Sequence, residues 1–397
     1  MLELDEPADL LVTCARGLAP YLREELLALG HEPREERETG VEVEATLREA
    51  YRLNLELRTA YHVLYRVAVF RCTSPDDLYH EVRELPWEEL IAQDGYVSVA
   101  SRVRHETVRN SMFPNLRTKD AIVDRIAERR GERPDAGPLR DQAVVSLRWF
   151  DDEASVYLDL SGQKLSDRGY RRSPHKAPLR ETLAAAIVLA SGYDGSQPLV
   201  NPMCGSGTLA IEAALVASGR APGLLRSGFG LQHLLGYDEE VWQGLRAEAR
   251  RATKPGKPAP IVASDVDPQA VEAAQRNAVT AGVDHLIRFE VCDFAETPVP
   301  EPNEAGGIVL VNPEYGERLG KSNELPATYK RFGDFLKQRC TGYTCWLFTG
   351  SKPLSKKVGL RANRRLTFMN GDIECKLLRY ELYAGKHQKK PDADGAE

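Results

Sequence analysis

A turn at residues 201–208, Asn-Pro-Met-Cys-Gly-Ser-Gly-Thr, has the composition of a ligand-binding loop between a strand and a helix. Two glycines let the backbone approach a ligand closely, and the N-terminus of the following helix attracts negative charge. Gly207 is not followed by lysine, which excludes a P-loop, and the glycine spacing is not that of a dinucleotide-binding fingerprint. Taken alone, the loop could equally be a structural turn.

Acidic residues follow the next two apolar runs at corresponding positions. Asp265 and Val266 follow residues 261–264, and Asp293 follows residues 287–291. A carboxylate at a strand tip beside a glycine-rich loop is placed to hold two ribose hydroxyls. Asp293 could accept from an adenine amino group, with Phe294 packed on the ring. Either aspartate alone could cap a helix, but three such features in order favour a nucleoside-containing ligand.

Residues 312–315, Asn-Pro-Glu-Tyr, follow a further apolar run. They resemble the Asp/Asn-Pro-Pro-Tyr/Phe motif of class I S-adenosylmethionine-dependent amino-methyltransferases. An exocyclic base amine is a poor nucleophile because its lone pair is delocalised into the ring. The resemblance implies that the Asn312 side-chain oxygen and the Pro313 carbonyl accept hydrogen bonds from this amine while Tyr315 stacks on the base. The alternative is a turn with a buried tyrosine.

The elements that carry these residues alternate between helices and strands. We expect helices at 179–191, 208–217, 268–281 and 329–339, and strands at 198–201, 261–264, 287–291, 307–312 and 344–349. Two further strand-like segments follow at 366–370 and 374–383. Alternation of this kind predicts a parallel, doubly wound sheet that binds ligands at the carboxyl ends of its strands.

The first 160 residues have a different pattern. We expect strands at 10–14, 41–45, 61–70, 96–103, 144–150 and 154–160, and helices near 20–29, 47–57 and 118–130. Residues 161–178 are rich in Gly, Ser, Pro and Arg, so they are predicted to form an interdomain linker.

Charge is distributed unevenly along the chain. The net charge is −6, but residues 1–45 hold twelve acidic side chains against four arginines, so the remaining residues sum to about +2. Residues 99–133 carry nine basic against five acidic side chains, and residues 161–180 carry six against one. Local basic stripes suit a polyanion, although two solvated surfaces would give the same pattern.

Composition excludes several classes of protein. The 397 residues suffice for two or three domains, and a content of 42% hydrophobic and 28% charged residues excludes a largely disordered chain. No apolar run approaches the roughly 18 residues of a membrane span, and the acidic start is unlike a signal peptide. Seven scattered cysteines without a C-x-x-C argue against disulfides and structural zinc. We therefore expect a cytoplasmic, metal-free protein.

Several motifs together resemble the THUMP-containing guanine-N2 RNA methyltransferases, in particular those that act on large-subunit (23S) rRNA. They include residues 13–18, 109–111, 118–124, 160–162, 168–171, 177–187, 201–208, 212–214, 220–223 and 312–319, in order along nearly the whole chain. The resemblance implies an α/β, Rossmann-like class I methyltransferase domain at 179–390. It implies an α+β ferredoxin-like unit at 1–60 and a THUMP RNA-binding domain at 44–160 before it, with a basic linker at 161–178.

The resemblance also implies ligands. S-adenosylmethionine is the implied cofactor, and RNA is the implied partner, as 23S rRNA or a ribosome assembly intermediate. Arg180 and Thr182 would lie near the methionine carboxylate of the cofactor. The full expected cofactor set is Arg180, Thr182, Asn201, Met203, Cys204, Gly205, Gly207, Thr208, Asp265, Val266, Asp293 and Phe294. The expected catalytic residues are Asn312, Pro313, Glu314 and Tyr315. The expected RNA contacts are Arg102, Arg104, Arg109, Asn110, Lys119, Arg168, Arg171 and Arg172.

Three departures from the family pattern matter. Asn201 replaces the usual aspartate, and Glu314 replaces the usual proline, where it would either act as a base or pair with Arg318. The chain also lacks the second domain that methylates guanine N7 in the longest members, so we expect one methylation.

Three functions stay open at this stage. The first is methylation of rRNA guanine N2. The second keeps this chemistry on another substrate, tRNA guanine N2 or DNA adenine N6, because the same motif serves several exocyclic amines. The third is a THUMP RNA-binding assembly factor with a degenerate catalytic site. The basic stripes favour structured RNA over DNA, and the intact motifs favour an enzyme.

Overall fold

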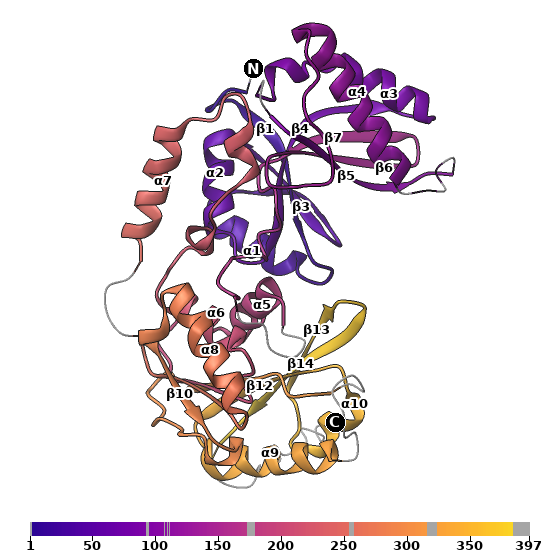
Figure 1. Ribbon diagram of the computed structural model, residues 1–397. Helices are drawn as coiled ribbons and strands as arrows, with labels where there is room; N and C mark the ends of the chain where they lie inside the picture. The colour runs from indigo at the N-terminus through magenta and orange to yellow at the C-terminus, as the bar shows by residue number, and fades with distance from the viewer. Residues whose placement is uncertain are drawn as a thin grey trace, which may run out of the picture.

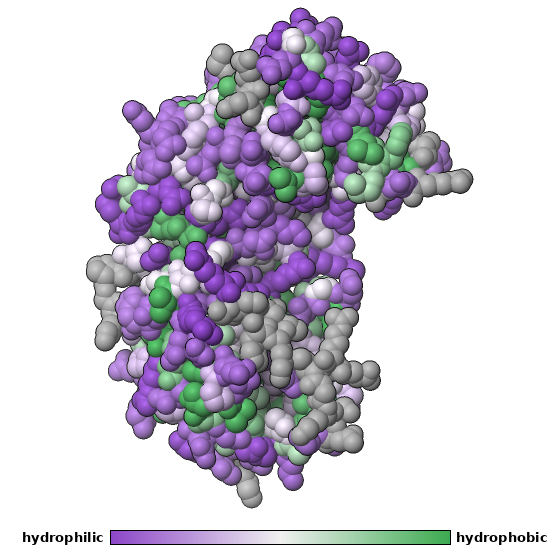
Figure 2. Space-filling view, in the orientation of Figure 1, coloured by the Kyte–Doolittle hydropathy of each residue, from purple (hydrophilic) through white to green (hydrophobic). Residues whose placement is uncertain are grey.

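The computed structural model describes residues 2–92, 95–106, 108, 110, 112–172, 179–253, 258–315 and 324–383. Two seven-stranded sheets, each accompanied by helices, form the two halves of an elongated molecule (Figure 1). Strands β1 to β7 belong to the N-terminal half and strands β8 to β14 to the C-terminal half. The face in Figure 2 is mostly hydrophilic, with small hydrophobic patches between the charged side chains. Within the described residues, no helix combines the length and apolar character required to cross a membrane.

The N-terminal sheet has the strand order β2-β3-β1-β4-β7-β6-β5. Strand β4 ties it together, because its first residues pair with β1 and its later residues pair with β7. The segments expected to be a ferredoxin-like unit and a THUMP domain therefore share one sheet, and their exact boundary stays a prediction. The strands are β1 (Pro7–Cys14), β2 (Pro33–Arg37), β3 (Gly40–Thr46), β4 (Ala60–Arg71), β5 (Val97–Arg104), β6 (Ala143–Phe150) and β7 (Glu153–Asp159).

The helices of this half are α1 (Ala19–Ala28), α2 (Leu47–Glu56), α3 (Pro75–Glu84) and α4 (Met112–Arg130), with a 3₁₀ turn η1 (Trp87–Glu89). Helix α2 begins with a capping box between Thr46 and Glu49. Sequence reasoning missed α3 and β2. Ser74 caps α3, which buries Leu78 and Val82, whereas β2 is a polar, exposed edge strand without apolar alternation.

The C-terminal sheet has the order β10-β9-β8-β11-β12-β14-β13. Its strands are β8 (Leu199–Pro202), β9 (Ile261–Asp265), β10 (Ile287–Val291), β11 (Gly307–Val311), β12 (Tyr343–Thr349), β13 (Arg364–Asn370) and β14 (Ile373–Glu381). The expected parallel arrangement holds from β8 to β12. Strand β14 runs antiparallel to both β12 and β13, because the short β13–β14 turn cannot make a parallel crossover.

The helices that follow β7 in the chain occupy the predicted places, with two additions, and one of these, α7, lies beside the N-terminal half (Figure 1). The helices are α5 (Glu181–Ser191), α6 (Thr208–Ala217), α7 (Glu239–Arg251), α8 (Pro268–Ala281), α9 (Leu325–Arg339) and α10 (Lys352–Lys357). The 3₁₀ turns are η2 (Pro222–Leu225), η3 (Gly230–His233), η4 (Asp284–Leu286) and η5 (Phe294–Glu296). Helices α7 and α10 were not predicted.

The two halves are joined by buried contacts. The segment predicted to be a linker includes the buried residues Ser161 and Tyr170 in its described part, and Ser161 donates to Asn54 of α2 at 2.6 Å. Helix α7 packs on α2. Tyr21 of α1 stacks on Phe368 of β13, with ring centroids 5.3 Å apart and planes 16° from parallel. These contacts make the described part of the junction a part of the core.

Candidate cofactor and target-base site

Three of the predicted motifs follow neighbouring strands at one edge of the C-terminal sheet. Strands β10, β9, β8 and β11 are adjacent and parallel. The glycine loop follows β8, Asp265 ends β9, and Asn312 follows β11. Because parallel strands end at the same edge, these residues line one site at the carboxyl ends of the sheet.

The glycine loop has the backbone geometry that its sequence predicted. Gly205 and Gly207 have φ angles of +55° and +82°, and Met203 also adopts a positive φ of +55°, which is uncommon for a residue with a side chain. A Cβ built on Gly205 would meet no described atom within 4 Å, so the loop leaves open space there. Gly207 serves packing instead, because its Cβ would lie 2.8 Å from the Cβ of Ala274 on α8.

Asp265 is tied to this loop. One carboxylate oxygen accepts the Gly205 N–H at 2.9 Å, and the other accepts the Asp267 N–H at 3.0 Å. Each carboxylate oxygen has a second lone pair, so both oxygens can still accept a ribose hydroxyl. The adjoining Val266 is 70% exposed, and an apolar side chain in that position can cover the face of a base.

Three buried oxygens of predicted site residues have no hydrogen-bond partner among the described residues. They are Oγ1 of Thr182, Oδ1 of Asn201 and Oδ1 of Asn312. The orientation of Asn201 is fixed, because its amide donates to the Leu310 carbonyl at 2.7 Å. A buried acceptor without a donor costs about 1–3 kcal/mol. Unmet acceptors beside an open glycine loop therefore fit a polar ligand such as S-adenosylmethionine and a base amine.

Asp293 and Phe294 follow β10, and the structure contradicts the role expected of Phe294. Asp293 accepts from the Ala295 N–H and from Arg331, each at 2.9 Å, and caps η5. Phe294 is only 7% exposed and packs edge-on against Phe332, while the Arg331 guanidinium lies 5.0 Å from its ring centroid. The prediction that Phe294 stacks on adenine was therefore wrong, because its ring belongs to the core under α9.

Tyr315 is held firmly beside Asn312. Its hydroxyl accepts from the Asn370 amide at 2.9 Å and lies 3.5 Å from the Cys375 thiol, which donates to it. Burial raises the pKa of this phenol, so it stays protonated. A Cβ on Gly350 would lie 2.8 Å from the tyrosine ring, so the ring packs directly on that backbone. Sequence reasoning missed Asn370, whose role depends on the hairpin folding back.

Glu314 has a different environment from its neighbours. Its side chain is exposed while Pro313 is buried, and its backbone carbonyl accepts from the Tyr329 hydroxyl at 3.3 Å. Arg318, the predicted partner of Glu314, lies outside the described residues. The carboxylate is therefore solvated, as expected for a residue that fills the family's second proline position.

The remaining predicted cofactor residues are Arg180, which precedes α5, and three residues of the glycine loop. Arg180 is exposed and donates to the Tyr61 hydroxyl of the N-terminal half at 3.1 Å. Met203 packs against the core below α9. Burial raises the pKa of the Cys204 thiol, which keeps it protonated. Thr208 is 5% exposed and accepts from Arg171 at 3.3 Å.

Two predicted RNA contacts, one buried and one half-buried, form ion pairs within the protein. Arg168 is 1% exposed, with its Nε 3.0 Å from a carboxylate oxygen of Glu212. Arg171 is ion-paired with Glu181 at 3.3 Å and donates to the Leu179 carbonyl. The prediction for Arg168 was wrong, because its guanidinium is closed off from solvent beside Glu212. Arg171 is half-buried, and its contact with RNA stays a prediction.

The other predicted RNA contacts are exposed or half-buried. Arg102 donates to Thr39 at 2.8 Å, and Arg104 lies 3.5 Å from Asp151. Lys119 pairs with Asp120 at 3.2 Å, and Asn110 accepts from the N–H of Met112 at the start of α4. Arg172 is exposed, and Arg109 lies outside the described residues.

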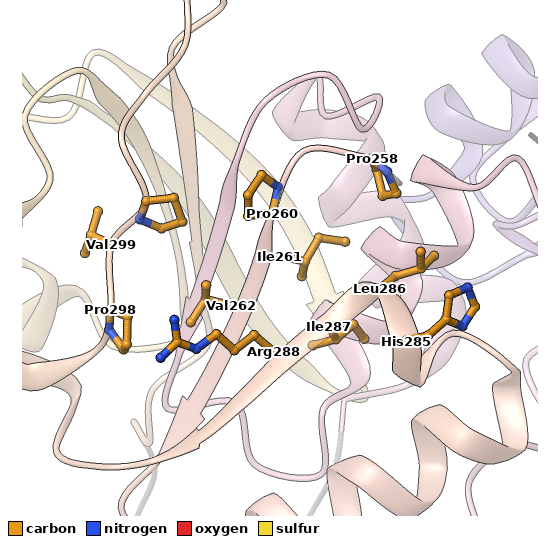
Figure 3. Close-up of a pocket in the computed structure, with 11 residues that line it drawn as sticks. Pro258, Pro260, Ile261, Val262, His285, Leu286, Ile287, Arg288, Pro298 and Val299 are labelled. Carbon is orange, nitrogen blue, oxygen red and sulfur yellow. The ribbon is translucent and has the colours of Figure 1, made fainter. Parts of the chain in front are cut away.

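A separate hollow of about 530 Å³ lies away from this site. It is formed at the opposite ends of β9 and β10 by prolines and aliphatic side chains, with His285 and Arg288 at its border (Figure 3). None of the strand-end residues described above lines it. Across the described part of the chain, no group of three or more His, Cys, Asp or Glu side chains is placed to hold a metal ion.

The sheet order, the glycine loop after its first strand, the acid after its second and the Asn-Pro-x-Tyr turn after its fourth define a class I methyltransferase. A family model described as an RMKL-like methyltransferase domain matches residues 168–379. Models of the RlmL ferredoxin-like domain and of the THUMP domain match residues 9–64 and 72–159. The chain belongs to the RMKL-like methyltransferase family, and the predicted fold class and family resemblance are confirmed.

Named relatives extend over nearly the whole chain. Ribosomal RNA large subunit methyltransferase K/L of Syntrophotalea carbinolica is 40% identical over 96% of this chain and 54% of its own length. A candidate RNA methyltransferase of Synechocystis is 34% identical over 94% of this chain and 96% of its own length. The chain spans about half the length of the K/L methyltransferases it matches.

Solved structures also cover both halves. SMU.472, a candidate methyltransferase crystallised with SAH, superposes with a TM-score of 0.85 at 26% identity, covering 96% of this chain and all of that chain. A Listeria monocytogenes protein described as a predicted N6-adenine-specific DNA methylase superposes with a TM-score of 0.84 at 30% identity. It covers 95% of this chain and 97% of that chain.

Proposed function

We propose that this chain transfers a methyl group from S-adenosylmethionine to the exocyclic N2 amine of a guanosine in 23S rRNA. The observation that carries the proposal is the buried, unpartnered Oδ1 of Asn312 beside Tyr315. This acceptor lies at the same sheet edge as the open glycine loop and Asp265. A buried acceptor without a donor would gain a hydrogen bond from an incoming base amine.

S-adenosylmethionine, when bound, supplies the methyl group on a positively charged sulfur. Asp265 would hold the ribose and the Gly205 backbone would pass under the methionine portion, with Thr182 and Asn201 offering acceptors. Asn312 Oδ1 and the Pro313 carbonyl would accept from the amine and favour the pyramidal geometry in which its lone pair can attack. Tyr315 would stack on the base and exclude water.

Two observations support RNA as the substrate class. A THUMP-domain model matches the N-terminal half, and a K/L methyltransferase of large-subunit rRNA is 40% identical. The rRNA substrate, the N2 position and a cytoplasmic location all belong to the proposal. An assembling ribosomal particle is compatible with the same site.

Mapping of modified nucleosides tests the proposal. A strain lacking the gene should lose N2-methylguanosine at one position of 23S rRNA while its tRNA is unchanged. The purified chain with labelled S-adenosylmethionine should restore the label to 23S rRNA from that strain. Labelling of tRNA or of duplex DNA instead of rRNA would overturn the assignment, and the DNA arm matters because of the Listeria likeness.

A further inference from the structure

One stretch of the C-terminal half carries positive charge without any negative charge. Residues 352–366, which we call the basic segment, run from α10 into β13 and contain six basic and no acidic side chains. All six are exposed. They are Lys352, Lys356, Lys357, Arg361, Arg364 and Arg365.

The six cations differ in their partners from the basic side chains of the THUMP region. Within the described residues none of them forms an ion pair, unlike the stripe of the THUMP region. There, Arg117 pairs with Asp76 at 2.7 Å and Arg125 with Glu88 at 2.9 Å. A cation that already has a carboxylate partner gains less from a phosphate than a free one. The basic segment is thus the better phosphate-binding surface.

The basic segment lies between two contacts with Tyr315. At its start, the Gly350 backbone packs on the tyrosine ring, and Ser351 then caps α10. Just beyond its end, Asn370 donates to the tyrosine hydroxyl at 2.9 Å. Figure 1 shows α10 and the β13–β14 hairpin on the same side of the C-terminal half. The segment therefore begins and ends next to Tyr315.

A pair of like charges indicates where an anion would be favoured. Arg364 on β13 lies directly opposite Arg379 on β14, and like charges in this register repel each other. Arg379 is compensated by Glu381 at 3.0 Å, but Arg364 has no ion-pair partner among the described residues. A phosphate at this point would remove the repulsion.

We propose that the basic segment binds the RNA phosphates that flank the target nucleotide while Tyr315 receives its base. This inference rests on the proposed function, since it requires RNA as the substrate. On helix α10, Lys352 and Lys356 are one turn apart and lie on one face. The segment thus presents a row of charges to a polyanion beside the site of chemistry, whereas the predicted THUMP stripe is largely neutralised.

The test compares a triple charge reversal in the basic segment with a double charge reversal elsewhere, both made in the full chain. One variant carries Lys356→Glu, Arg361→Glu and Arg364→Glu. The control carries Arg250→Glu and Arg251→Glu on α7, which are exposed and lie far from α10 in Figure 1. Binding to 23S rRNA from a strain lacking the gene is measured against salt concentration. A glutamine version of the triple variant guards against effects of the added negative charge on folding.

We expect the triple variant to bind this RNA about 10- to 100-fold more weakly at physiological salt. The slope of the logarithm of the binding constant against the logarithm of salt concentration should become shallower by about 2 to 3, because each lost phosphate contact removes about 0.7–0.9 from it. S-adenosylhomocysteine binding should be unchanged, and the control should bind RNA like the wild type. Triple and control variants with equal RNA affinity would overturn this inference. If the wild type binds and methylates tRNA rather than 23S rRNA, the proposed function is overturned. The role of the basic segment is then tested by comparing the tRNA affinities of the triple and control variants.

Discussion

The Nε of Arg168 lies 3.0 Å from a carboxylate oxygen of Glu212, and both side chains are almost completely buried. Arg168 also donates to the Arg58 carbonyl of the N-terminal half at 2.7 Å, and Tyr170 donates to Glu212 at 3.0 Å. Glu212 lies on α6, the helix that begins at the glycine loop. The pair therefore connects the N-terminal half to the helix that supports the cofactor loop.

Removing one member of this pair should destabilise the protein strongly. In Glu212→Ala, the Arg168 guanidinium stays buried without its carboxylate, which costs about 3–5 kcal/mol. Urea unfolding measures the loss, with Glu248→Ala on the exposed face of α7 as a control expected to change stability by less than about 0.5 kcal/mol. Equal stability of the two variants would show that the pair is not structural.

Catalysis should depend on Asn312 far more than on Glu314. Asn312→Ala removes the unpartnered acceptor and should lower single-turnover methyl transfer by about 10²–10³-fold. Glu314→Pro should keep most activity, because the Glu314 side chain is solvated. Calorimetry with S-adenosylhomocysteine serves as the control for folding and cofactor binding. Glu314→Gln could also prove as slow as Asn312→Ala while folding and cofactor binding are unchanged. In that case the Glu314 carboxylate is the base that removes the proton from the methylated amine.

Cofactor affinity should fall when Asp265 is shortened. Asp265→Ala loses the hydrogen bond from Gly205 and the acceptor for ribose hydroxyls, so affinity should drop by about 1.5–3 kcal/mol. Titration calorimetry with S-adenosylhomocysteine measures this change. Asp284→Ala, an exposed residue in η4 at the opposite end of the strands, is the matched control. An unchanged affinity in Asp265→Ala would remove this residue from the site.

Acid should lower the free energy of unfolding, in part because the Glu88 carboxylate becomes protonated. Arg125 donates to both oxygens of its carboxylate, at 3.0 and 2.9 Å, and these bonds lower the pKa of Glu88 below its ordinary value of 4.5. At a pH between the pKa of Glu88 in the folded protein and its pKa in the unfolded chain, the unfolded chain binds more protons. The contribution of Glu88 to stability is therefore complete above about pH 4.5, and it is lost as the pH falls through the pKa of the folded protein.

Urea unfolding between pH 7 and pH 3 checks this acid dependence. Glu88→Gln should be less stable than the wild type by about 1 kcal/mol at neutral pH, and the difference should vanish at the acidic end. A difference that is the same at every pH would mean that Glu88 acts through packing rather than through its charge.

Local sequence patterns predicted the strand-end residues but not what surrounds them. Asp265 and Asn312 were identifiable because strand tips are visible as the ends of apolar runs. Phe294 and Arg168 were misassigned, since burial by α9 or pairing with Glu212 depends on contacts far apart in the sequence. The support of Tyr315 by Asn370 had no local signal either. The acid-free run of cations at 352–366 was readable, but only the fold shows that it borders Tyr315.

The stack of Tyr21 on Phe368 joins residues about 350 positions apart in the chain. At a synthesis rate of roughly 5–20 residues per second, α1 leaves the ribosome about 20–70 s before its aromatic partner on β13. During that interval Tyr21 of α1 lacks its stacking contact with Phe368. The docking of the two halves is therefore a late event in biogenesis, and the nascent N-terminal half is a natural point at which a chaperone can act.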